Sequence, residues 1–245
     1  MLIGTAGWSI PGDTADAFPA GASQLERYAA VMPVVEINSS FHRPHRRTTY
    51  ARWAASVPTE FRFSVKMPKD ISHTRKLVDC AAPLDAFAEQ IAGLGETLGV
   101  VLLQLPPSHA FSQEVAAGFF DAARQRIGAG IGLACEPRHP SWFAEDVDAF
   151  LAERRVARVA ADPVLAAGAE RPGGWTGLRY RRLHGSPRVY HSPYDAERLR
   201  DLAGTIARED VPSWCIFDNT ASGAATRNAL DLRAELRSRD EAARG

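Results

Sequence analysis

The sequence predicts an α/β protein that folds as one closed (β/α)₈ barrel over residues 1–245, with a functional rim where the strands end. Three observations support this prediction. Strand-like segments alternate with amphipathic segments of helix length about eight times. The strand segments separate apolar from polar side chains, and most of them end in charged or amide side chains. An open doubly wound sheet stays an alternative, although such sheets usually contain fewer strands.

Composition sets limits on the partners. The chain is 45% hydrophobic, which is enough for one large core, and its 29 basic residues balance 29 acidic ones. A chain without net charge has no general electrostatic attraction for nucleic acid or anionic membranes. It could bind nucleic acid only through a local basic patch. Three widely spaced cysteines, no signal-like N-terminus and no apolar run of membrane-spanning length predict a cytoplasmic protein. The sequence makes no prediction of oligomeric state.

The predicted elements follow in chain order. The strand-like segments are residues 2–7, 34–40, 62–67, 100–105, 132–138, 158–162, 178–184 and 213–219. Amphipathic helices are predicted over residues 24–32, 84–94, 115–127, 142–151 and 195–207. Residues 165–177 are rich in Ala, Gly and Pro, so the sixth crossover is expected to be short or irregular. The charged residues 233–244 indicate the solvated end of a last helix.

Side-chain alternation assigns the two faces of each strand. In the second strand Val35 and Ile37 share one face, and Glu36 and Asn38 share the other. The third and fourth strands alternate in the same way. We expect the apolar face to meet the helices and the polar face to point into the barrel. The last strand is ambiguous, because either Asp218 or Asn219 could face inward.

The stretch at residues 133–142 carries the densest chemistry. A buried strand delivers Glu136 and Arg138 to one face and His139 just beyond its end. Pro140 ends the pairing, and Ser141 is placed to cap the following helix. Buried ionisable groups destabilise a fold unless they are paired, so such a cluster indicates a function.

Strand ends elsewhere supply further polar groups, and active sites of such barrels lie at the carboxyl ends of the strands. The predicted rim consists of Trp8, Glu36, Asn38, Lys66, Gln104, Glu136, Arg138, His139, Asp162, Arg182, His184, Asp218 and Asn219. The alternative is a structural network in which these charges pair with one another and nothing is catalysed.

The cations on this rim predict the ligand class. Lys66, Arg138 and Arg182 favour a small anionic molecule, since guanidinium groups bind carboxylates and phosphates bidentately. The small-residue loop 219–227, with Ser222 and Gly223, could present backbone N–H groups to a phosphate. An ordinary Ser-capped helix is the alternative there. We expect Trp8, Asn38, Gln104, His139 and Asn219 to contact the same ligand.

We assign catalytic roles to four residues: Glu36, Glu136, Asp162 and His184. Glu136 is the predicted general base and His184 the predicted general acid, and Lys66 would stabilise developing negative charge. The reaction would be a hydrolysis, an elimination or an isomerisation. The loop 185–194 could be a lid that brings Tyr190 to the ligand, or a plain surface loop.

Two alternatives stay open. A noncatalytic barrel could use the same mouth to bind a metabolite or partner, and a divalent metal could assist a hydrolase. We expect no metal and no other cofactor, because the sequence has no closely spaced His pair and no acidic metal loop, and the interleaved cations would repel a metal ion.

Seven collinear motifs, spread over nearly the whole chain, resemble the YecE-like proteins, the family called domain of unknown function 72. They are IGTAGWS at 3–9, VEINSSFH at 35–42, FSVKMP at 63–68, LQLPPS at 103–108, EPRHPSW at 136–142, RLHG at 182–185 and NTASGAA at 219–225. The resemblance implies a TIM-type barrel and no particular reaction, cofactor or substrate. His42 stands where the family often has Tyr, and Asp218 stands where it more often has Asn.

Overall fold

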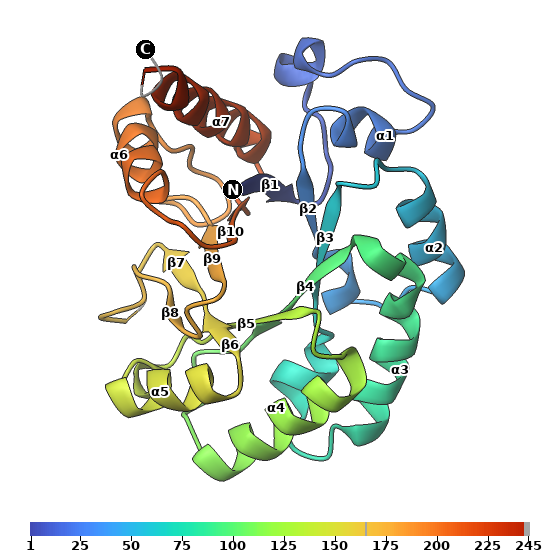
Figure 1. The fold of residues 1–245 in the computed structure, drawn as a ribbon, viewed down its shortest axis with the longest axis vertical. Helices are drawn as coiled ribbons and strands as arrows, with labels where there is room; N and C mark the ends of the chain where they lie inside the picture. Colours follow the sequence, from blue (N-terminus) through green and yellow to red (C-terminus); the bar gives the residue numbers. More distant parts are fainter. Residues whose placement is uncertain (165, 243–245) are drawn as a thin grey trace.

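The computed structural model describes residues 1–164 and 166–242 and shows a mixed α/β barrel (Figure 1). Its strands are β1 (Leu2–Ala6), β2 (Val34–Ile37), β3 (Arg62–Lys66), β4 (Leu98–Gln104), β5 (Gly132–Glu136), β6 (Val156–Arg158), β7 (Ala160–Asp162), β8 (Gly173–Gly174), β9 (Arg179–Leu183) and β10 (Ser213–Phe217). All eight predicted strand segments are present, so the predicted fold class is confirmed.

The ten strands form one sheet in the order β7-β9-β10-β1-β2-β3-β4-β5-β6-β8. The count exceeds eight for two reasons. The sixth predicted strand is divided at Val159 into β6, which pairs with β5, and β7, which pairs with β9. The short β8 adds an antiparallel pairing to β6. The chain between β6 and β7 therefore joins the two ends of the sheet and nearly closes the barrel.

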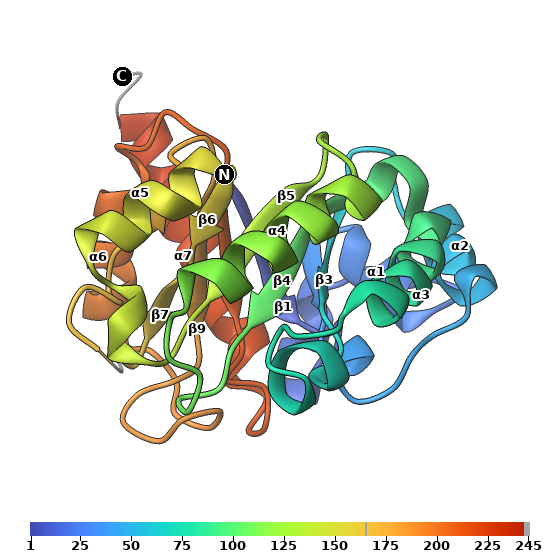
Figure 2. The same ribbon diagram turned by 90° about the horizontal axis from the view of Figure 1, so that it is seen from below.

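Helices lie on the outer side of the strands, as Figures 1 and 2 show. They are α1 (Gln24–Ala29), α2 (Arg47–Ala55), α3 (Ala81–Ile91), α4 (Gln113–Ile127), α5 (Glu145–Glu153), α6 (Ala196–Ile206) and α7 (Ala224–Ala242). Short helical turns are η1 (Gly12–Ala17), η2 (Ser39–Phe41), η3 (Asp70–Thr74), η4 (Ala92–Thr97) and η5 (Pro140–Trp142).

The predicted helix over residues 142–151 begins later than expected. Residues 140–142 form the separate turn η5, and α5 starts at Glu145 with Ala144 at its N-cap. The prediction that Ser141 caps this helix is wrong. Its hydroxyl instead accepts a hydrogen bond from the Phe111 N–H (2.8 Å) and contacts the His139 ring. Ser141 therefore ties two loops together.

The sixth crossover is irregular, as predicted. Between β7 and β9 the described residues form turns and the two-residue strand β8, with no α-helix among them. Leu165, the first residue of the predicted irregular segment, lies outside the described residues, as do residues 243 and 244 of the predicted charged tail. The rest of that tail continues α7.

Strand alternation divides the core into two parts. Outward-facing residues such as Val35 and Val65 pack with the helices in the larger cluster. Inward-facing residues such as Val34, Leu102 and Ile216 fill the barrel in a second cluster. Two residues after each of these apolar side chains comes a polar side chain that also faces inward, at the carboxyl end of the strand: Glu36, Gln104 and Asp218. Alternation alone thus carries buried charge to one end of the barrel.

Gly4 in β1 is the tightest glycine position in the sheet, and it gives a test of the barrel's packing. A Cβ atom there would overlap the carbonyl oxygen of its partner Val34 in β2. We expect Gly4→Ala to lower the free energy of unfolding by about 1–3 kcal/mol in urea titrations, because the two strands must separate. Gly118→Ala is the matched control. Gly118 is exposed in α4 with open space around it, so alanine should stabilise the protein by about 0.5–1 kcal/mol.

No helix in the described part of the chain combines the length and the apolar character that crossing a membrane requires.

Candidate functional site

A buried guanidinium organises the carboxyl end of the barrel. Arg182, at the end of β9, has no exposed surface, and its Nη2 donates to Glu36 Oε1 (2.7 Å) and Asp218 Oδ2 (2.9 Å). Its Nη1 donates to Glu136 Oε2 (2.7 Å), and its Nε donates to Glu36 Oε2 (3.0 Å). Carboxylates from β2, from β5 and from just beyond β10 therefore meet on one cation. We refer to Glu36, Glu136, Arg182, His184 and Asp218 as the ion cluster.

His184 occupies the position between two carboxylates of the ion cluster. Its Nδ1 lies 3.0 Å from Asp218 Oδ2, and its Nε2 lies 3.1 Å from Glu136 Oε1. Burial disfavours the charged ring, but the charge of Glu136 and the hydrogen bonds to both carboxylates outweigh burial and raise the His184 pKa above 6.5. A doubly protonated ring can donate to both carboxylates, so this geometry stabilises the charged form of His184.

The pKa of Glu136 is shifted in the opposite direction to that of His184. Burial would raise the pKa of this carboxyl, but Arg182, His184 and Arg138 together hold it well below 4.5. Arg138 contributes through Nε and Nη2, which lie 3.1 and 2.9 Å from Glu136 Oε1. A carboxylate with a low pKa accepts a proton poorly, so this environment is unfavourable for the predicted role of Glu136 as general base. The geometry favours a positioning role toward His184 and Arg138.

Lys66 differs from the other cations in its surroundings. It ends β3, is 6% exposed, and places Nζ 4.1 Å from the centroid of the Phe41 ring. Burial and the nearby charge of Arg182 lower its pKa to about 8. The carboxylates of the ion cluster are engaged by Arg182 and His184, and no salt bridge joins one to Lys66 within the described residues.

Arg138 is not a member of the ion cluster, but it contacts the cluster and is more exposed than the residue it contacts. Its side chain is 15% exposed, whereas the Glu136 side chain it contacts is fully buried. Its Nη2 also lies 3.5 Å from His184 Nε2. Among the cations of the mouth, Arg138 is therefore the one that a small molecule from solvent could reach first, and Lys66 is the more deeply buried.

Asp162 lies apart from the ion cluster, contrary to its predicted catalytic role. Its Oδ1 accepts from the Tyr194 hydroxyl (2.8 Å), and its Oδ2 accepts from Arg198 Nη2 (2.8 Å) in α6. The side chain therefore faces the helical layer. His139 is also engaged structurally, since its Nδ1 accepts from the Ser141 N–H (3.2 Å) at the start of η5.

The last strand resolves the ambiguity between its two final polar residues. Asp218 belongs to the ion cluster, and it was absent from the predicted catalytic set. Asn219 faces the other way, where its Nδ2 donates to the Ser192 carbonyl (3.0 Å) and to Asn228 Oδ1 (2.9 Å) of α7. This amide holds two loops together, so its predicted ligand contact is not where the side chain points.

The remaining predicted binding residues, Gln104, Trp8 and Asn38, differ in how exposed they are. Gln104 is 8% exposed at the end of β4, and Trp8 is half-buried with its ring 5.1 Å from that of Trp53. Asn38 is half-buried, and its Oδ1 has no hydrogen-bond partner among the described residues. An orphaned buried acceptor of this kind could accept a hydrogen bond from a ligand.

The loop after β10 retains few of the free donors that the sequence suggested. The N–H groups of Ala221, Gly223 and Ala225 donate to carbonyls within the protein, and the Ser222 hydroxyl donates to the His191 carbonyl. Gly223 adopts a positive φ of 80°, as a tight turn requires. A phosphate at this loop would have to displace internal hydrogen bonds or use the remaining N–H groups.

Two tyrosines lie at the site outside the predicted catalytic and binding residues: Tyr180, which was not predicted, and Tyr190, which was named only for a possible lid. The Tyr180 hydroxyl, two residues before Arg182 on the same strand face, lies 2.9 Å from both Glu36 Oε2 and Ser64 Oγ. Strand alternation could have identified it. Tyr190 is 40% exposed on the loop 185–194, with its ring centroid 5.7 Å from that of His184. That position agrees with the hypothesis of a lid over the mouth.

The ion cluster is organised around a guanidinium. Within residues 1–164 and 166–242 no group of three or more His, Cys, Asp and Glu side chains is placed to hold a metal ion.

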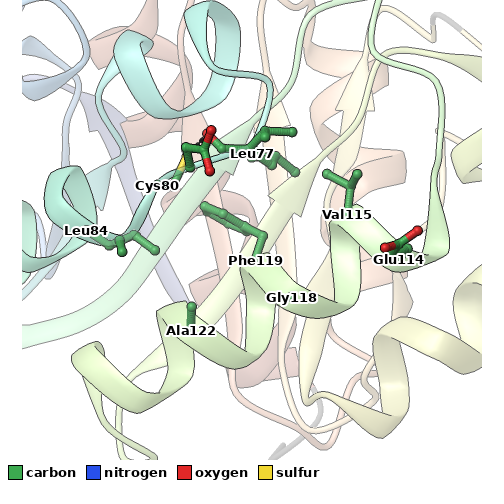
Figure 3. Close-up of a pocket in the computed structure, with 11 residues that line it drawn as sticks. Leu77, Cys80, Leu84, Glu114, Val115, Gly118, Phe119 and Ala122 are labelled. Atoms are coloured by element: carbon green, nitrogen blue, oxygen red, sulfur yellow. Dashed lines mark hydrogen bonds between the residues drawn. The ribbon is translucent and has the colours of Figure 1, made fainter.

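A separate groove lies on the outside of the barrel, between the segment 77–84 and α4 (Figure 3). Its volume is about 450 Å³ and its lining is mainly apolar, including Leu77, Leu84 and Phe119. Its one thiol, Cys80, has a pKa raised to about 11 by burial, so it is a poor nucleophile. Its other ionisable lining residues are Asp79 and Glu114, with no histidine, lysine or arginine in the lining that the structure describes, so the ion cluster is the better candidate site.

Comparison of the sequence with known proteins gives its relatives. The family model described as "Protein of unknown function DUF72" matches residues 2–244. The UPF0759 protein YecE of Escherichia coli K12 is 30% identical over 176 residues, which cover 68% of this chain and 61% of that protein. The UPF0759 protein YunF of Bacillus subtilis 168 is 28% identical over 153 residues, covering 59% of this chain and 52% of that protein. The matched regions thus span between half and two thirds of these relatives.

Solved structures agree with the fold. A DUF72 family protein from Enterococcus faecalis V583 superposes with a TM-score of 0.80 at 22% identity, covering 96% of this chain and 95% of its own. A DUF72 family protein from Thermotoga maritima MSB8 gives a TM-score of 0.75 at 25% identity, covering 96% and 98%. The family model matches nearly every residue, and this match shows that the chain belongs to the DUF72 family.

Proposed function

We propose that this protein is an enzyme that performs acid-base chemistry on a small anionic substrate at the carboxyl-end mouth of its barrel. One observation carries the proposal. His184 is held between Glu136 and Asp218 in a buried ion cluster that Arg138, 15% exposed, contacts from the solvent side. A buried histidine whose pKa is raised, beside an accessible arginine, has the features of a general acid next to an anion-binding site.

The charges of the side chains around the mouth favour an anionic ligand over a cationic one. Three carboxylates, Glu36, Glu136 and Asp218, are opposed by Arg138, Arg182 and Lys66. A protonated His184 then leaves one surplus positive charge when Lys66 is also charged. In a site of low dielectric a surplus charge is costly, and a bound carboxylate or phosphate would neutralise it.

The catalytic roles follow from the pKa directions. His184 would hold the proton to be donated, and because Glu136 and Asp218 engage both ring nitrogens, the proton would pass through one of these carboxylates or a water molecule. Lys66, with its pKa lowered to about 8, is better matched to accept a proton near neutral pH than Glu136 is. Arg182 would act by positioning, because carboxylates of the protein already use its donors. The reaction could be a hydrolysis, an elimination or an isomerisation.

The proposed setting is the cytoplasm. The three cysteines, Cys80, Cys135 and Cys215, are free and buried, which suits a reducing compartment.

The Arg138 side chain provides the test of the anion site. We expect pyruvate and inorganic phosphate, titrated separately in thermal-shift experiments, to raise the melting temperature of the wild-type protein. Arg138→Ala should weaken this stabilisation about tenfold in apparent Kd, as loss of one charge-assisted contact would. Arg47→Ala is the matched control, because Arg47 is 60% exposed on α2 and should leave binding unchanged. Equal binding by wild type and Arg138→Ala would refute the proposed site.

A further inference from the structure

Lysine is rare in this chain, and its one buried example lies in the mouth. Of the 29 Lys and Arg residues, only Lys66, Lys69 and Lys76 are lysines. Lys69 and Lys76 are exposed, whereas Lys66 is 6% exposed. The other buried cations of the barrel, such as Arg182, are arginines. Arginine would supply positive charge at position 66 as well, but it cannot lose its proton. A lysine at this position therefore offers a property that arginine lacks, which is a neutral amine.

The fold fixes this amine in place. The Ser40 hydroxyl donates to the Lys66 carbonyl (2.6 Å), which joins the end of β3 to η2. The next residue of η2, Phe41, covers Nζ with its ring at 4.1 Å. The ring keeps water away on one side, and Arg182 contributes a like charge from the barrel interior. Desolvation and a neighbouring cation are the two means by which proteins activate a lysine as a nucleophile.

We propose that Lys66 forms an imine with an aldehyde or ketone substrate that also carries an anionic group. This inference rests on the proposed function and narrows its substrate from a small anion to an anionic carbonyl compound. Arg138 would hold the anionic group, and His184 would supply the proton that the dehydration step needs.

The proposed step balances without any oxidant or reductant. The Nζ lone pair bonds to the carbonyl carbon, the carbonyl π pair moves to oxygen, and a proton passes from nitrogen to that oxygen. A second proton from His184, relayed through Glu136, Asp218 or water, converts the hydroxyl to water. The C–O bond then breaks as the nitrogen lone pair forms the C=N bond. The products are a protonated imine, one water molecule and neutral His184.

Reductive trapping tests the inference on the wild-type protein. The protein is incubated with pyruvate and sodium cyanoborohydride, and its intact mass and peptide map are measured. We expect one adduct, heavier by the mass of pyruvate less one oxygen atom, located on Lys66. Labelling should increase as the pH rises toward about 8, where the amine becomes neutral. Dihydroxyacetone phosphate should label the same residue if the site accepts phosphate. Labelling spread over Lys69, Lys76 and the N-terminal amine, or no labelling by either probe, would overturn the proposal.

Two comparisons sharpen the result. Acetone has the carbonyl group without the anionic group, so it should label Lys66 at least about tenfold more slowly at equal concentration. Lys66→Met should remove the adduct, while Lys69→Arg and Lys76→Arg should keep it. If Lys66→Met does not fold, the wild-type peptide map decides the question alone.

The same probes separate this inference from the proposed function. Pyruvate that raises the melting temperature but leaves no adduct on Lys66 would overturn the imine and retain the anion site. Pyruvate that neither stabilises nor labels the protein would count against both.

Discussion

Replacing Arg182 with Met should lower the free energy of unfolding at pH 7 by more than about 3 kcal/mol, the range seen when one partner of a buried ion pair is removed. Arg182 donates to Glu36, Glu136 and Asp218 at distances of 2.7–3.0 Å, and its side chain is fully buried. Met would leave three carboxylates inside the barrel without their shared cation. Urea titration with a circular dichroism readout measures the effect.

The pH dependence of this loss identifies its cause. In the wild-type protein the pKa values of Glu136 and Asp218 are lowered, below 4.5 and 3.8 respectively. Their contribution to stability is therefore present above those values and is lost as the pH falls through the folded-state pKa. Without Arg182, burial would raise both pKa values, so the variant would gain protons on folding. Its deficit relative to wild type should narrow as the pH falls from 7 toward 4.

An exposed ion pair provides the control for Arg182→Met. Arg198 contacts Asp162 at 2.8 Å, but its side chain is 53% exposed. Arg198→Met should cost less than about 1 kcal/mol, because solvent screens such pairs. Similar losses in the two variants, or a deficit for Arg182→Met that is constant with pH, would contradict the role of Arg182 as the cation that holds the ion cluster together.

The substitution Glu136→Gln should neutralise His184. Glu136 is the largest of the influences that raise the His184 pKa, so its removal leaves burial to dominate and the pKa should fall below 6.5. The amide can keep an acceptor toward Arg182, but its NH₂ would face the imidazole, which must then be neutral to accept. Side-chain NMR titration of the histidine rings follows this change directly. Glu60→Gln, at an exposed residue before β3, should leave the His184 titration as in wild type.

The free energy of unfolding should also change when Glu136→Gln neutralises His184. A raised histidine pKa contributes stability that is full below 6.5 and is lost as the pH rises through the folded-state value. Glu136 contributes above 4.5 because its own pKa is lowered. Glu136→Gln should therefore cost about 1.5–3 kcal/mol, the range for a hydrogen bond to a charged group, with its maximum between these two limits. A His184 titration that is unchanged in Glu136→Gln would separate the histidine from this carboxylate.

Much of the site could be predicted because strand alternation is a strict rule. Once Val35 and Ile37 are assigned outward, Glu36 must face inward, and the same reasoning places Lys66 and Glu136 at the same end of the barrel. Barrel closure then brings together residues such as Glu36 and Arg182 from opposite ends of the chain.

Alternation gave no answer where the sequence lacks apolar contrast. The segment before Asp162 consists of Val159, Ala160 and Ala161, so either face could be the inner one. In the structure Val159 faces the interior and the strand changes partner there, which sends Asp162 to Tyr194 and Arg198. Asp218 and Asn219 posed the same difficulty, and the packing of Ile216 inside the barrel settled it.

The sequence also could not predict which charged side chains pair with one another. Residue types indicate that Arg182 could bind an anion, but only coordinates show that Glu36, Glu136 and Asp218 already use its donors. The balance between burial and these partners decides each pKa direction, and both depend on distances. For this reason the proposed proton acceptor moves from Glu136 to Lys66.

A crystal structure of the protein soaked with pyruvate at pH 7 would test the mouth of the barrel most directly. We expect density for the anion in contact with Arg138 and within reach of Lys66 Nζ, with the ion cluster unchanged beneath it. An empty mouth at saturating pyruvate, or pyruvate bound only on the outer helices, would contradict the proposal that this cluster serves an anion-binding active site.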